Sequence, residues 1–164
     1  MALFVPGMKC RLCGLPIEAS QERILFSPFV LNRADPLFVF SDAALHRRCV
    51  HNHPLAGHAL KQHAEAQEQG KPERRRCVVC GERIQDPDDY FGTGLLTGNP
   101  SSKAFEFNYL HVHRSHFSDW ARAKTFRSAV EELCSSTAWE GPRIDFEPGP
   151  KWGPPTSSPL KSSR

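Results

Sequence analysis

Cys10-Arg11-Leu12-Cys13-Gly14 and His46-Arg47-Arg48-Cys49 are the two stretches that decide the fold of this 164-residue chain. The pattern returns further along as Cys77-Val78-Val79-Cys80-Gly81 and His113-Arg114-Ser115-His116. The gap from Cys13 to His46 equals the gap from Cys80 to His113. One Cys-x-x-Cys is weak evidence for any site. Two copies, each completed at the same distance by a second pair, are strong evidence.

Cysteine and histidine at this spacing are typical zinc ligands. Zinc takes four ligands in a tetrahedron, and its structural sites are built from thiolates and imidazoles. A Cys-x-x-Cys turn supplies two ligands from one side, and a pair at i, i+3 supplies two from one face of a helix. The sequence therefore predicts two zinc ions per chain, with the ligands Cys10, Cys13, His46 and Cys49 at the first site and Cys77, Cys80, His113 and His116 at the second.

The two copies align without a gap when residue n is set against residue n + 67. Gly14 meets Gly81, and a glycine after the second cysteine suits a tight turn that needs positive φ. This register selects His113 rather than His111 as a ligand, because Ala44 occupies the position equivalent to His111. Duplication of one module is the simplest explanation.

Each copy predicts a turn, then extended chain, then helix. In the first copy we expect strands at 24–31 and 37–40, and a helix that begins at about Ala43 and is interrupted by Pro54 before a second piece at 55–69. In the second copy only 103–107 is a clear strand. A helical stretch is expected from about 110 to 135, with a new N-cap at Ser118.

Ligand order and spacing resemble the treble-clef family of zinc fingers, in which a metal-binding turn and a hairpin precede a helix that carries the other ligands. The resemblance covers 10–49 and 77–116 and implies a small α+β fold. The sites also bear a distant likeness to LIM domains, which pair Cys-x-x-Cys with His-x-x-Cys, but LIM domains have a shorter spacer and an immediately following second quartet. RING domains interleave eight ligands, whereas each quartet here is contiguous.

Composition divides the chain into four parts. The first zinc module is expected at 1–69, a polar linker at 70–76 and the second module at 77–140. A tail at 141–164, rich in proline, glycine and serine, is expected to be largely disordered. Four apolar residues indicate that a short part of that region docks on a module, namely Trp139, Ile144, Phe146 and Trp152.

Cysteine use favours a reducing compartment. Five of the six cysteines are placed as ligands, and Cys134 falls on an apolar helical stripe, where a buried structural role is expected. No signal peptide and no membrane span are recognised, so the chain is expected in the cytoplasm.

Four protein ligands close a zinc site, whereas a catalytic zinc keeps one position for water. We therefore expect structural metals and no enzyme. His51-Asn52-His53 only superficially resembles the HNH nucleases, whose named residues are dispersed over the whole motif. A non-catalytic adaptor that binds a protein partner is the main expectation. Nucleic-acid binding is the alternative, because basic residues such as Arg122 and Arg127 lie near the ligand helices. The net charge of only +3 makes it the second choice.

Overall fold

The computed structural model describes residues 4–137, 139–142 and 144. Most of the tail predicted at 141–164 lies outside the described residues. Helices and small antiparallel sheets are both present, so the chain is of the α+β class that the sequence predicts. Among the helices of the described residues, none combines the length and the apolar character that crossing a membrane requires.

The first half opens with a tight turn around Cys10 and Cys13. The Cys10 N–H donates to the carbonyl of Leu15 at 2.9 Å, and the Gly14 N–H donates to the carbonyl of Cys10 at 2.7 Å. Gly14 has a φ of 74°, the left-handed region in which a side chain is unfavourable. The turn is closed by a bridge between Lys9 and Pro16.

Two strands follow, and the second lies at Ala43–His46 rather than at the predicted 37–40. Strand β1 (Arg23–Phe26) pairs antiparallel with β2 (Ala43–His46), with Arg23 opposite His46. The predicted strand at 37–40 is wrong, because Pro36–Val39 forms a 3-10 helix. Asp35 caps that helix by accepting from the Leu37 N–H at 2.8 Å, and a proline at its start suits helical φ.

Two helices complete the first half. The predicted start at about Ala43 is wrong, because helix α1 (Arg47–His51) begins only after strand β2. Helix α2 (Ala56–Gln69) follows, and the interruption predicted at Pro54 is confirmed because that residue lies between the two helices.

The second half repeats this arrangement further along the chain. Strand β3 (Tyr90–Gly92) pairs with β4 (His111–His113), with Tyr90 opposite His113. Tyr90 and His113 are the residues equivalent to Arg23 and His46, so the two sheets have the same strand register. Helix α3 (Ala123–Ser135) likewise begins at the residue equivalent to Ala56, where α2 begins.

Three predictions for the second half are wrong. The expected strand at 103–107 contains a 3-10 helix, Phe105–Phe107. The expected helix from about 110 begins instead as β4 and continues as a 3-10 turn, Arg114–His116. The N-cap of α3 is Arg122 rather than Ser118.

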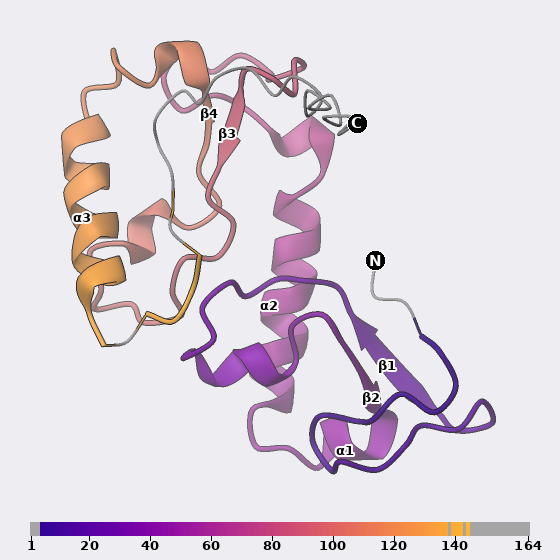
Figure 1. The fold of residues 1–164 in the computed structure, drawn as a ribbon. Helices are drawn as coiled ribbons and strands as arrows, with labels where there is room; N and C mark the ends of the chain where they lie inside the picture. Colours follow the sequence, from indigo (N-terminus) through magenta and orange to yellow (C-terminus); the bar gives the residue numbers. More distant parts are fainter. Residues whose placement is uncertain (1–3, 138, 143, 145–164) are drawn as a thin grey trace, which may run out of the picture.

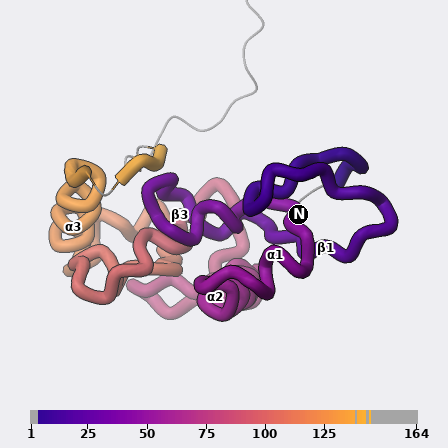
Figure 2. The backbone as a smooth tube through the Cα atoms, turned by 90° about the horizontal axis from the view of Figure 1, so that it is seen from below, coloured from indigo at the N-terminus to yellow at the C-terminus, as the bar shows by residue number. Residues whose placement is uncertain are grey.

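The two halves have separate cores that meet along one boundary (Figures 1 and 2). Helix α2 runs between the two lobes in Figure 1. Leu95, from the second half, is buried in the first core and forms a bridge with Val30. The Glu140 N–H donates to Oδ1 of Asn32 at 2.8 Å, and the Arg33 N–H donates to the Glu140 carbonyl at 3.1 Å. These contacts join the halves.

Candidate metal centres

Four side chains converge in the first half. Cys10 and Cys13 lie on the opening turn, His46 ends β2, and Cys49 lies on α1. One ligand atom from each lies within 4.8 Å of every other. Nδ1 of His46 lies 3.4 Å from Sγ of Cys13 and 3.8 Å from Sγ of Cys49. The pairing of β1 with β2 places His46 here.

The second half brings together the equivalent four residues. Cys77, Cys80, His113 and His116 also place their ligand atoms within 4.8 Å of one another. Nδ1 of His113 lies 3.6 Å from Sγ of Cys80, and Nδ1 of His116 lies 3.7 Å from Sγ of Cys77. The eight residues in the two groups are those that the sequence spacing selects. His46 is buried, whereas both histidines of the second group are partly exposed, so the second group is more open to solvent.

The separations between ligand atoms match a tetrahedral metal site. Zn–S bonds of about 2.3 Å and Zn–N bonds of about 2.0 Å at tetrahedral angles imply a sulfur-to-nitrogen edge of about 3.5 Å. The four separations run from 3.4 to 3.8 Å. All six cysteines are free of disulfides, so the thiols are available as ligands.

The far side of the His46 ring is also held. Nε2 of His46 lies 3.0 Å from Oε1 of Gln21, and the same oxygen accepts from the Glu18 N–H at 2.8 Å. If Nδ1 of His46 faces the thiols, Nε2 carries the proton and donates it to Gln21. Such a contact orients a ligand histidine and fixes its tautomer. The role of Gln21 was missed from the sequence, because it depends on the strand register.

Backbone hydrogen bonds lower the pKa of one cysteine at each site and so favour its thiolate form. Burial raises the pKa of the Cys10 thiol, but backbone hydrogen bonds from His46, Cys13 and Leu12 outweigh it and lower the pKa to about 7. Cys77 has the same balance of burial against backbone hydrogen bonds, and its pKa falls to about 6. Burial, a hydrogen bond with Cys13 and the charges of Cys10 and Cys13 raise the pKa of Cys49 to about 11. A bound cation would offset the repulsion among the thiolates of Cys10, Cys13 and Cys49.

His111 lies outside the second group. Its Nδ1 lies 2.9 Å from the hydroxyl of Tyr90, and its Nε2 lies 3.2 Å from the carbonyl of Gln69. Burial lowers the pKa of this imidazole. His111 therefore connects the end of α2 to β3 and is engaged away from the thiols.

The spare histidines of the first half do not converge either. Nε2 of His51 accepts from Nε of Arg47 at 3.4 Å. Nδ1 of His53 accepts from the Leu55 N–H at 3.2 Å, and its ring packs edge-on against Phe40. Cys134 is partly buried against the second core, and burial raises its pKa. It is not a member of either group.

Fold and site together define a class: a small α+β protein with two possible metal-binding Cys/His centres. Comparison of the chain with protein-family models, with curated proteins and with solved structures finds no match. The function must therefore be argued from the residues themselves.

Proposed function

We propose that this chain binds two zinc ions in closed structural sites and acts as a non-catalytic adaptor for a protein partner. The observation that carries the proposal is the pair of four-residue groups in which only thiols and imidazoles lie within 4.8 Å of one another. Thiolate and imidazole together favour zinc over magnesium or calcium, which prefer oxygen ligands. Free thiols of this kind suit a reducing compartment, so we place the chain in the cytoplasm.

The arrangement of each half supports a structural role for the metal. In both halves a cysteine turn is followed by two paired strands, with a histidine ligand at the end of the second strand. This order resembles the treble clef, and the common register supports duplication of one module. Four protein ligands leave no coordination position for a catalytic water. Zinc would then stabilise two small cores that are marginal without it.

Several arginines are already engaged within the chain, which favours a protein partner over nucleic acid. Arg47 lies 3.7 Å from Glu22, and Arg122 forms a hydrogen-bonded ion pair with Glu106. The guanidinium of Arg127 lies over the ring of Phe117. The neighbouring carboxylates offset part of the charge of Arg47 and Arg122, which reduces the attraction of these arginines for phosphate.

Metal analysis of the purified chain tests the zinc sites. Native mass spectrometry should give two zinc ions per chain, and Cys13→Ser and Cys80→Ser should each remove one. Zero or one zinc in the unaltered chain would contradict the proposal.

Titration with a fluorescent single-stranded or duplex oligonucleotide at low salt tests the alternative. No binding is expected. Binding that disappears on Arg122→Glu with Arg127→Glu would make the chain a nucleic-acid-binding protein instead.

A further inference from the structure

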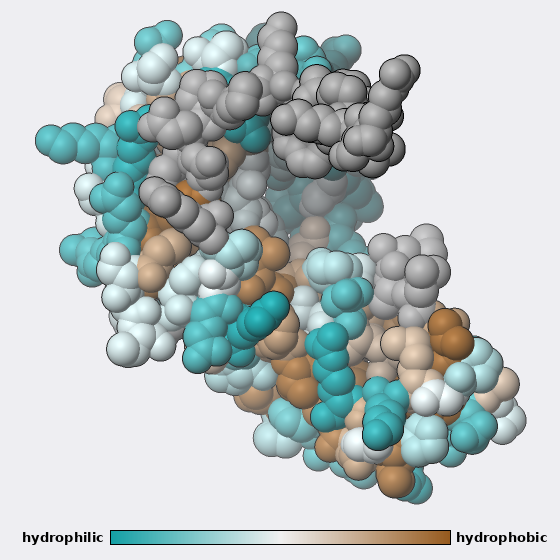
Figure 3. Space-filling view, viewed as in Figure 1, coloured by the Kyte–Doolittle hydropathy of each residue, from teal (hydrophilic) through white to brown (hydrophobic). Residues whose placement is uncertain are grey.

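Exposed apolar side chains are concentrated in the first half of the chain. Six large ones are more than a third exposed there, namely Val5, Met8, Leu15, Leu25, Leu31 and Leu60. Figure 3 shows hydrophobic side chains, in brown, on the visible face of the lower lobe and where the lobes meet. An exposed apolar side chain gains importance where it lines a cavity, because binding sites are concave and largely apolar.

The second half provides an internal control for these positions. The equivalent residues there are Pro72, Arg75, Glu82, Gly92, Gly98 and Arg127. The backbone contacts are equivalent: the Cys10 N–H donates to the carbonyl of Leu15, and the Cys77 N–H donates to that of Glu82. The fold therefore forms without apolar side chains at these positions.

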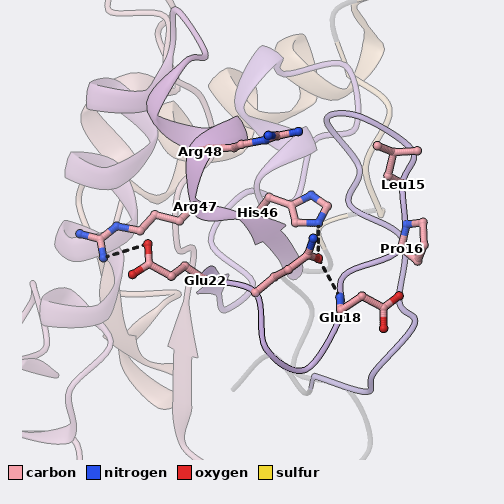
Figure 4. A pocket seen from close by; sticks show the side chains of 8 residues that line it. Leu15, Pro16, Glu18, Glu22, His46, Arg47 and Arg48 are labelled. Atoms are coloured by element: carbon pink, nitrogen blue, oxygen red, sulfur yellow. Dashed lines mark hydrogen bonds and ion pairs between the residues drawn. The ribbon is translucent and has the colours of Figure 1, made fainter.

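One of these side chains lines a cavity of about 480 Å³ beside the first metal centre. Figure 4 shows Leu15 and Pro16 on one side of this cavity, facing His46 and Arg48 on the other. Glu18 lies at the end away from Arg48. The cavity is therefore walled by the metal-binding turn and by the start of α1, both of which the metal would hold in place.

The chemistry of this cavity is specific to the first half. Leu15, Pro16 and Arg48 correspond to Glu82, Arg83 and Ser115 in the second half. Equivalent bridges, Lys9 with Pro16 and Arg76 with Arg83, show that the turn itself is the same. Neither the apolar wall nor the arginine is needed to build the turn.

The two arginines at the cavity differ in their engagement. Arg47 is paired with Glu22 at 3.7 Å. Within the described part of the chain, the Arg48 guanidinium has neither a hydrogen bond nor an ion pair. An exposed cation without a partner, facing an apolar wall, is complementary to a carboxylate carried next to an apolar side chain.

We propose that this cavity binds a peptide segment of a partner protein in which a large apolar side chain is followed by an acidic residue. The apolar side chain packs on Leu15 and Pro16, and the carboxylate accepts from the Arg48 guanidinium. This proposal rests on the proposed adaptor function and names the kind of segment that the adaptor recognises.

Short capped peptides with the core Leu-Asp test it on the full zinc-loaded chain. Titration followed by ¹H–¹⁵N NMR should shift the amides of residues 14–22 and 46–49, with weak affinity as expected for an isolated segment. Leu-Asn and Ala-Asp peptides should bind about tenfold more weakly, because each lacks one of the two contacts.

Three variants each replace a residue of the first half with the residue found at the equivalent position of the second half. Arg48→Ser should weaken Leu-Asp binding by about tenfold but leave the discrimination between Leu-Asp and Ala-Asp. Leu15→Glu should abolish binding. Leu60→Arg, an exposed exchange on α2 that does not line the cavity, is the matched control and should change nothing.

Zinc content separates failure of this proposal from failure of the proposed function. Two zinc ions with no peptide-induced shifts, or equal shifts with Ala-Lys peptides, overturn the docking site and leave the structural zinc sites standing. A chain without zinc overturns both, because the metal would hold the cavity walls. If an oligonucleotide binds the unaltered chain and this binding is lost on Arg48→Ser, the cavity binds phosphate, and the proposal of a peptide ligand is overturned.

Discussion

At the residue scale, the imidazole of His46 is held at both of its nitrogens. Nδ1 faces the thiols of Cys13 and Cys49, and Nε2 faces Oε1 of Gln21. The residue equivalent to Gln21 in the second half is Asp88. Its backbone N–H donates to Asp86 at 2.9 Å. The two sites therefore differ in what surrounds their ligands as well as in the ligands themselves.

Replacing Gln21 should weaken only the first site. Gln21→Leu leaves the His46 Nε2–H without an acceptor, so the zinc affinity of the first site should fall by about 10–100-fold. Gln21→Glu keeps an acceptor and should retain the affinity. Competition with a chromophoric chelator gives the measurement, and Asp88→Leu is the matched control. An equal loss in Gln21→Leu and Gln21→Glu would show that the hydrogen bond is unimportant.

Exchanging one ligand should change the order in which the sites lose zinc. Three thiolates give the first site a formal charge of −1 with zinc, whereas the second site is neutral, so the first should hold zinc more tightly. Cys49→His should remove this advantage by making both sites neutral, and Cys49→His combined with His116→Cys should give it to the second site. Stepwise chelation followed by native mass spectrometry measures the order. Release from the unaltered first site before the second would contradict the charge argument.

At the element scale, the metal-binding turns depend on left-handed glycines. Gly14 and Gly81 have φ of 74° and 76°, and an added Cβ at either would meet no atom within 4 Å. The cost of a side chain there is therefore conformational. Gly14→Ala should destabilise the zinc-loaded chain by about 1 kcal/mol. Thermal unfolding measures it.

Gly57 on α2 is the matched control for this exchange. An added Cβ there would also meet open space, but the φ of Gly57 is not positive. Gly57→Ala should therefore stabilise the chain, by about 0.5 kcal/mol, because alanine favours helix. A loss of stability in both variants would indicate that the space around them, rather than φ, decides the effect.

Helix α2 is attached to the end of β1 through His63, a partly buried histidine. Nε2 of His63 accepts from the Ser27 N–H at 3.0 Å, and its ring packs on Phe26 with centroids 5.0 Å apart. Burial lowers the pKa of His63 below its ordinary value of 6.5. As the pH falls, position 63 therefore becomes protonated at a higher pH in the unfolded chain than in the folded chain. The stability that His63 contributes is complete above about pH 6.5 and is lost as the pH falls towards the lower folded pKa.

A glutamine at position 63 should remove this part of the pH dependence. His63→Gln keeps an acceptor for Ser27 but does not titrate. Unfolding temperatures of both proteins should be compared at pH 7.5 and pH 5.5. Zinc release at acid pH is common to both, so the difference between them isolates His63. The unaltered protein should lose more stability than the variant, and an equal loss would contradict the assignment.

The sequence predicts the ligand groups and the glycine turns, but it misses the elements that strand pairing decides and the locally capped 3-10 helix at Pro36–Val39. Ligand spacing, the glycine turns and the break at Pro54 follow from individual residues. The segment at 43–46 is predicted as helix because alanine and leucine favour it, but pairing with β1 overrides that preference. Asp42, with a φ of 50°, turns the chain into this strand. The Gln21–His46 contact depends on the same pairing and was missed for the same reason.

At the scale of the whole molecule, the second half contributes residues to the core of the first half. Leu95 belongs to the second half but is only 4% exposed within the first core. The Tyr109 hydroxyl donates to Oε1 of Gln62 at 3.4 Å, and the Glu140 N–H donates to Asn32. The first core therefore depends in part on the second half, and we expect the two halves to unfold together.

Truncating Leu95 should reveal this dependence. Leu95→Ala removes a buried side chain and leaves a cavity, so the stability should fall by about 3 kcal/mol. Because the cavity lies in the first core, hydrogen exchange should accelerate at 26–45 although the substitution lies in the second half. Leu31→Ala, at a position that is 43% exposed, is the matched control and should have little effect. Faster exchange confined to 90–112 after Leu95→Ala would show that the halves are independent and that the boundary contacts do not couple them.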